Sequence, residues 1–207
     1  MDRSPADTLA WMREGHRLWA HGIAGLEAGA WEAGSVLPGW TRRHLVAHVA
    51  ANADALGNLV RWAATGVETP MYASPEERAR GIEQGARLDP ADLAAWSERS
   101  ATALADALDR LTGEQWEREI RTAQGRVLPA TEIPWLRARE ACVHAVDLGA
   151  GLGFADLPEA FLAALVADIT DKRGEIPDVR GPLPEVAAWL AGRPHSLPDA
   201  PDLGPWL

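Results

Sequence analysis

Apolar residues recur at helical intervals along most of the chain. After Ser4 and Pro5, residues such as Leu9, Met12 and Ile23 fall on one helical face, and the pattern ends near Gly25. A serine followed by proline is a typical helix start, because serine caps free N–H groups and proline has none to satisfy. The same periodicity predicts helices over residues 41–65, 74–87, 90–113 and 131–149. Four of these helices are long, so the predicted fold class is mainly α.

The remaining stretches follow other patterns. Residues 116–130 carry short β-branched runs on either side of Gln124 and Gly125, which favours a small hairpin. After Gly153, helices are predicted over residues 158–174 and 184–192, and the rest becomes rich in proline and glycine. Trp189 and Trp206 are expected to dock this tail on the bundle. We therefore divide the chain into residues 1–153 and a smaller C-terminal region, residues 154–207.

The segment TEIPWLRAREACVHAVDLG, residues 131–149, places ionisable side chains in a helix that is otherwise apolar. Arg137, Glu140, His144 and Asp147 are spaced by three, four and three residues, so they share one face. A helix that is apolar almost all round is expected to be buried. Burying a carboxylate and an imidazole is unfavourable unless each finds a partner, and a divalent cation would serve both.

A third ligand is available in the helix predicted over residues 41–65. His44 and His48 are four residues apart on one face, and Asn52 continues that face. Two helices distant in sequence thus carry His/His and Glu/His pairs at a spacing that suits borderline metals such as zinc. The residues alone predict a metal site that includes one of the two histidines.

Composition limits the choice of partners and compartment. The 207 residues suit one ordinary domain with a small appendage, and the net charge of -10, without a basic stripe, argues against nucleic-acid or anionic-membrane partners. The single cysteine, Cys142, fits a reducing compartment, so we expect a cytoplasmic protein, and we expect a monomer. Cys142 lies on the helix side opposite Glu140 and His144, which disfavours it as ligand or nucleophile.

Several motifs together resemble a known family. The segments GWTRRHLVAHVAANADALGNLVRWA, YASPEERARGIEQGA, WLRAREACVHAVDLG and the closing WLAGR resemble the mycothiol-dependent maleylpyruvate isomerases, which belong to the DinB-like metalloprotein superfamily. The resemblance covers residues 5 to about 165. It implies a DinB-like four-helix bundle with one zinc ion held by His48, Glu140 and His144. His44 then lies near the site without being a ligand.

The resemblance also implies roles for other residues. Arg78 and Arg193 match arginines that hold the carboxylates of an acidic substrate, and Asp147 matches an acidic position beside the histidine ligand. We assign these three residues to catalysis, and His44 and Asn52 to contact with the thiol cofactor. After Lys172 the chain departs from the pattern, because the segment from Arg173 to Gly181 is too short for the strands of a small α/β domain. The expected C-terminal appendage is therefore short and reduced.

The implied chemistry uses the thiol of a small-molecule cofactor and not a cysteine of the protein. Three protein ligands leave one zinc position open, where a thiol would lose its proton. The thiolate of mycothiol would add to the cis double bond of maleylpyruvate, allow rotation and leave again, giving fumarylpyruvate. A mycothiol S-transferase would keep the adduct instead. A zinc hydrolase, with Asp147 or His44 as general base, and a metal-free binding bundle are the alternatives from other classes.

Overall fold

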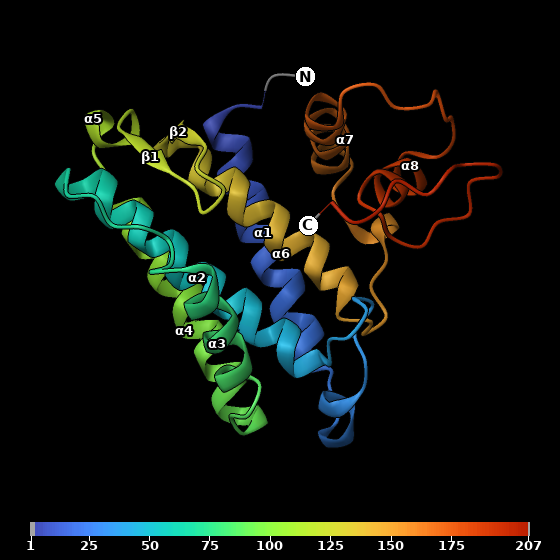
Figure 1. Cartoon of the computed structure of the whole chain (residues 1–207), viewed down its shortest axis with the longest axis horizontal. Helices are drawn as coiled ribbons and strands as arrows, with labels where there is room; N and C mark the ends of the chain where they lie inside the picture. The colour runs from blue at the N-terminus through green and yellow to red at the C-terminus, as the bar shows by residue number, and fades with distance from the viewer. Residues whose placement is uncertain (1–2, 207) are drawn as a thin grey trace.

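The computed structural model describes residues 3–206 and is mainly helical, as the sequence predicts. Four long helices form its body, α1 (Pro5–Ala24), α2 (Arg42–Thr65), α4 (Pro90–Asp109) and α6 (Ile133–Asp147). Helix α1 packs on α6, and α2 packs on both α4 and α6 (Figure 1). The predicted bounds agree with the observed ones to within a few residues. None of the helices within residues 3–206 is long and apolar enough to cross a membrane.

Local capping explains where the helices begin. The Ser4 side chain accepts a hydrogen bond from the backbone N–H of Asp7, and the Asp7 carboxylate accepts one in return from the backbone N–H of Ser4. Thr41 caps α2 by accepting from the N–H of His44. Helix α2 ends at Gly66, whose φ of 75° is a left-handed conformation that glycine adopts without strain. These caps fix the ends of α1 and of α2, the helix that carries His48.

Helices α1 and α6 approach closely because small residues line their contact. A Cβ atom added to Gly15 would lie 2.8 Å from the Cys142 Sγ, so no larger residue fits there without a shift. This contact sets which side of α6 faces α1. Cys142 lies on that side, and the polar stripe of α6 therefore faces α2 and the cavity described below.

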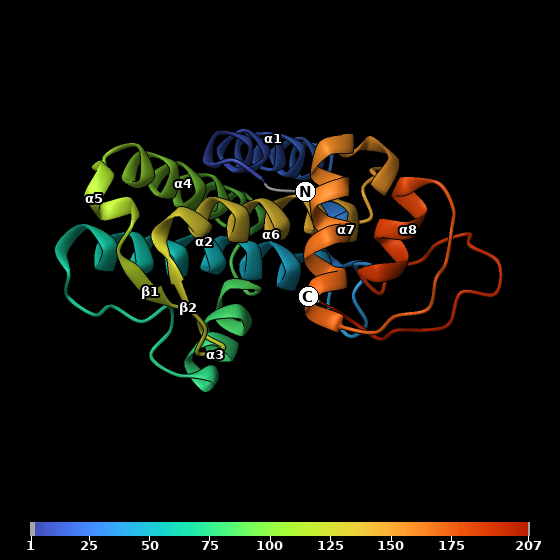
Figure 2. The same cartoon turned by 90° about the horizontal axis from the view of Figure 1, so that it is seen from above.

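Shorter elements cover the side of α2 and α6 that faces away from α1 and α4. Helix α3 (Pro75–Gly85) packs on α2, and α5 (Gly113–Trp116) leads into a hairpin of β1 (Glu119–Arg121) and β2 (Val127–Pro129). The strands pair antiparallel with Ile120 opposite Leu128, which confirms the predicted hairpin. Figure 2 shows α1 and α4 on one side of α2 and α6, with α3 and the hairpin on the other. Two short 3₁₀ segments, η1 (Ala28–Glu32) and η2 (Ala130–Glu132), precede α2 and α6 in the chain.

The C-terminal region contains η3 (Phe154–Asp156), α7 (Glu159–Arg173) and α8 (Leu183–Leu190), and no strand up to residue 206. Helices α7 and α8 pack on each other beside α6 (Figure 1). The Trp189 indole is buried and donates to the Pro201 carbonyl, while Arg173 donates to the carbonyls of Leu203 and Gly204. These bonds hold the tail in place. The division at residue 153 remains an interpretation of the sequence.

Candidate metal centre

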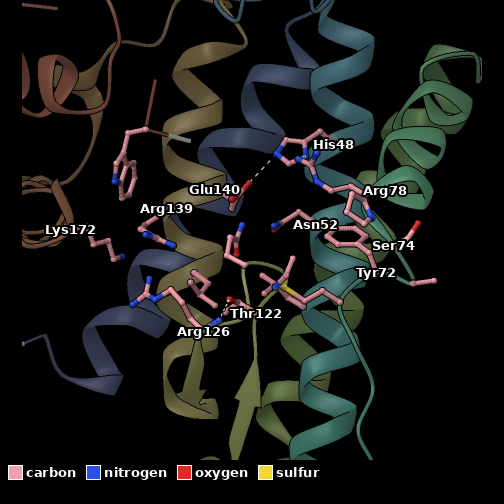
Figure 3. A pocket seen from close by; sticks show the side chains of 18 residues that line it. His48, Asn52, Tyr72, Ser74, Arg78, Thr122, Arg126, Arg139, Glu140 and Lys172 are labelled. Carbon is pink, nitrogen blue, oxygen red and sulfur yellow. Dashed lines mark hydrogen bonds and ion pairs between the residues drawn. The ribbon is translucent and has the colours of Figure 1, made fainter. Parts of the chain in front are cut away.

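The three residues matched as metal ligands meet in space. His48 comes from α2, and Glu140 and His144 come from successive turns of α6; one ligand atom from each lies within 4.8 Å of the others. The Glu140 Oε2 is 3.1 Å from the His48 Nε2 (Figure 3). The same oxygen is 3.4 Å from the His144 Nε2. All three side chains are largely buried. Two imidazoles and a carboxylate at this spacing are a donor set that suits zinc.

Burial and ion-pair contacts shift the pKa values of all three side chains. Burial alone would lower the pKa of His144, but its contacts with Asp147 and Glu140 raise it. Burial alone would raise the pKa of the Glu140 carboxyl, but its contacts with His144 and His48 hold that pKa well below its ordinary value. Burial lowers the pKa of His48, which favours the neutral imidazole that metals bind. Glu140 is therefore an anion between two imidazoles, and a divalent cation would compensate its charge.

The Nδ1 side of the His144 ring contacts a buried ion pair between Asp147 and Arg193. The His144 Nδ1 lies 2.8 Å from the Asp147 Oδ2, and Arg193 donates to both oxygens of that carboxylate, at 2.9 Å from Nε and 2.7 Å from Nη2. Asp147 is fully buried, and His144 and Arg193 are nearly so. A carboxylate that accepts from Nδ1 fixes the imidazole tautomer and leaves Nε2 free as a ligand. The contact expected between Asp147 and the histidine ligand is thus present.

Arg193 does not lie where a substrate-binding role requires it. Its third donor, Nη1, is taken by the Ala191 carbonyl at 2.7 Å, and only 5% of its surface is exposed. The side chain does not line the cavity next to the ligand cluster. The position differs from the sequence expectation because Arg193, which follows α8, bonds to Asp147, the last residue of α6, and does not reach the cavity. Arg193 supports the ligand histidine through Asp147.

A cavity of about 720 Å³ opens in front of His48 and Glu140. Arg78 lines it, and the Arg78 Nη2 lies 3.2 Å from the His48 Nδ1, next to the metal ligands. The Tyr72 ring lies against Arg78, with its centre 5.9 Å from the guanidinium carbon. Among the described residues, four cationic side chains and one carboxylate line the cavity, namely Arg78, Arg126, Arg139 and Lys172, with Glu140. An acidic ligand therefore suits this cavity.

The two residues assigned to cofactor contact differ in position. Asn52 lines the cavity, and its Oδ1 accepts a hydrogen bond of 3.0 Å from Arg137, so its amide nitrogen is left as the group that can donate into the cavity. His44 does not line the cavity. The His44 Nδ1 lies 2.7 Å from the Thr41 hydroxyl and its Nε2 lies 3.6 Å from Glu83 at the surface. The proposed contact of His44 with a thiol therefore gains no support from its location.

Sequence reasoning missed several residues that line the cavity, namely Tyr72, Arg126, Arg139, Lys172 and Trp206. One signal was available for Arg139, because a second arginine in an otherwise apolar buried helix needs a partner just as Arg137 does. Another was available for Lys172, the only lysine beside 19 arginines in the chain. The hairpin and the tail carry no comparable signal, because only the fold brings them to α6.

Cys142 is expected to be dispensable for activity. Burial raises the pKa of its thiol, and the Sγ lies 3.8 Å from the Trp11 carbonyl on α1, away from the ligand cluster. We expect Cys142→Ala to keep full turnover and to lower the free energy of unfolding by about 1 kcal/mol through lost packing. Urea denaturation and a rate assay measure both. Lost turnover in a folded, metal-loaded variant would instead identify Cys142 as the nucleophile.

Comparison with known proteins assigns the family. The model of the mycothiol maleylpyruvate isomerase N-terminal domain matches residues 3–149. The chain belongs to this family. The crystal structure of the mycothiol-dependent maleylpyruvate isomerase is 35% identical, with a TM-score of 0.92 over 99% of this chain and 98% of that chain. A histidine-to-alanine mutant of that isomerase gives a TM-score of 0.93 at the same identity and coverage. Curated protein sequences gave no match.

The structural match extends through the C-terminal region of this family member. Because 98% of the solved isomerase chain is covered, that chain has no long C-terminal segment without a counterpart here. Relative to that isomerase, the region after Lys172 is not shortened. The helices α7 and α8 and the tail that carries Trp206 thus belong to a shared architecture.

Proposed function

We propose that the protein isomerises maleylpyruvate to fumarylpyruvate, using zinc and mycothiol. The observation that carries this proposal is the His48, Glu140 and His144 cluster at the wall of a cationic cavity, in a chain of the mycothiol maleylpyruvate isomerase family. Mycothiol and maleylpyruvate are named for the family and for the similar crystal structure. Location in the cytoplasm, a monomeric state and the lack of nucleic-acid or membrane partners stay predictions from composition.

The donor set fits zinc. Two imidazoles and one carboxylate satisfy three positions of a tetrahedral ion and leave the fourth for a small molecule, which is the pattern of catalytic zinc sites. When bound, zinc would lower the pKa of a coordinated thiol so that the thiolate is present at neutral pH. Asp147 and Arg193 would hold His144 in the orientation that this binding needs.

The only cysteine of the chain, Cys142, is buried with a raised pKa, so it does not suit the role of a nucleophilic thiol. A reversible addition to the double bond therefore requires a thiol from outside. The residues of the cavity would bind and orient the substrate, with Arg78 pairing with a carboxylate near the ligand cluster. Arg78 and the amide nitrogen of Asn52 would also donate to the carbonyl oxygen beside the double bond, where negative charge develops during addition.

The proposal predicts activity that depends on a thiol the reaction does not consume. Purified protein with bound zinc should convert maleylpyruvate only after mycothiol is added, as followed by the absorbance of the substrate, and titration of free thiol should show the same amount before and after. Consumption of thiol with a stable adduct would indicate an S-transferase. Isomerisation at the full rate without mycothiol would contradict a mechanism in which the thiolate of mycothiol adds to the double bond.

A further inference from the structure

The cavity has a second cationic region away from the metal ligands. Figure 3 shows His48 and Arg78 at one side of the cavity and Arg139 and Lys172 at the other, with Glu140 between them. Arg139 comes from α6, Lys172 from α7 and Arg126 from the hairpin turn. We call these three residues the distal cation cluster.

Among residues 3–206, the distal cation cluster contains more positive charge than its ion-paired carboxylate neutralises. One carboxylate, Asp168, accepts from both Arg139 at 3.0 Å and Lys172 at 2.6 Å on the same oxygen, Oδ2. Arg126 adds a third cation. Burial and the nearby Arg139 lower the pKa of the Lys172 ammonium, despite its pair with Asp168. Cations held together in this way repel one another, and an anion between them would relieve the repulsion.

A buried donor in the cluster also lacks a partner. Arg139 is 8% exposed, and its Nε has no hydrogen-bond acceptor among residues 3–206. Buried donors are nearly always satisfied, so the hydrogen-bonding capacity of this guanidinium is not fully used by its pair with Asp168. The Trp206 ring lies 5.0 Å from the Arg139 guanidinium carbon and 5.8 Å from the Lys172 Nζ, which shields both cations from water on that side.

We propose that the distal cation cluster is a second carboxylate site, which binds the carboxylate of the substrate that lies farther from the metal. The proposal rests on the proposed function and specifies it: the enzyme selects dicarboxylates, because Arg78 holds one end of the substrate and the distal cluster holds the other. Guanidinium and ammonium groups recognise carboxylates through charge-assisted hydrogen bonds. A monocarboxylate would leave one of the two cationic regions without a partner and would bind more weakly.

Kinetics of charge-removing variants test this site. Lys172→Gln and Arg126→Gln suit the test, because these side chains are more exposed than the buried pair of Arg139 and Asp168. Each should raise KM for maleylpyruvate by about tenfold, the loss of one charge-assisted hydrogen bond, with kcat within about twofold and zinc retained. Arg180→Gln removes the same charge from an exposed ion pair outside the cavity and should leave KM unchanged. An unchanged KM in both cluster variants would overturn the proposal.

Chemical labelling tests the same site without turnover. Lys172 is the only lysine, so acetylation by acetic anhydride, located by peptide mass spectrometry, reports on it alone among the side-chain amines. Pimelate, an unbranched dicarboxylate, should protect Lys172 in the zinc-loaded protein, and heptanoate, its monocarboxylate counterpart, should protect it much less. Equal protection by both, or protection by mycothiol alone, would overturn the proposal.

The two experiments test the second carboxylate site independently of the proposed isomerase function. Protection of Lys172 by pimelate that is lost in Arg126→Gln supports the second carboxylate site even if maleylpyruvate proves not to be the substrate. Thiol-dependent isomerisation with unchanged KM in both cluster variants supports the function and rejects the site.

Discussion

Replacing His48 with alanine is expected to lower bound zinc from about one ion per chain to nearly none, and to reduce isomerisation by at least ~100-fold. The His48 Nε2 lies 3.1 Å from Glu140 in a largely buried cluster, so its loss removes one of three donors and leaves the Glu140 carboxylate with a single imidazole. Elemental analysis of protein purified without added metal measures the occupancy. Circular dichroism checks that the helices persist.

His21→Ala is the matched control for this experiment. His21 is an exposed histidine in the last turn of α1 and does not belong to the ligand cluster, so its removal should change neither zinc content nor rate. Full zinc occupancy in His48→Ala, or an empty site in the unaltered protein, would show that these three residues do not form the metal site.

Replacing Asp147 with alanine is expected to lower the free energy of unfolding by roughly 3–5 kcal/mol. The substitution leaves Arg193 buried with neither of its carboxylate bonds, and an unpaired buried charge is strongly destabilising. It also releases His144, so zinc affinity should fall by about 10–100-fold. Urea denaturation with and without zinc, together with competition against a chelator, measures both effects.

Two further variants serve as controls for Asp147→Ala. Asp178→Ala breaks an exposed arginine–aspartate pair and should change stability by less than about 0.5 kcal/mol. The double variant Asp147→Leu with Arg193→Met should recover much of the stability, because apolar side chains replace both charges, but not the zinc affinity. A double variant with normal zinc affinity would contradict the positioning role of Asp147.

Local pattern was sufficient to predict the elements and the pairing of ligands within one helix. Helical periodicity brings Glu140 and His144 to one face whatever surrounds them, because residues four apart lie one turn from each other. Serine, threonine and proline at the helix starts predicted the observed caps for the same reason, since a cap involves only the first turn. The small hairpin was predicted from its own residues as well.

Periodicity alone could not choose between His44 and His48, which share a face of α2. His48 is 6% exposed and contacts Glu140, whereas His44 lies in the first turn of the helix, where its side chain meets Thr41 and the surface residue Glu83. The resemblance to the family favoured His48. The physical reason that His48 and not His44 meets Glu140 is that His48 lies deeper in the bundle. That depth depends on how α2 crosses α6 and not on the spacing of residues within α2.

The chain by itself thus determined its helices, their caps and the carboxylate–imidazole pair that a metal needs, because these depend on contacts within a few residues. Only the tertiary structure decided that Arg193 supports His144 through Asp147, and that Arg126, Arg139 and Lys172 meet at the far side of the cavity. These residues come from α6, α7, the hairpin and the segment after α8, and the packing of separate elements sets the distances between them. Spacing along the sequence carries no information about such distances.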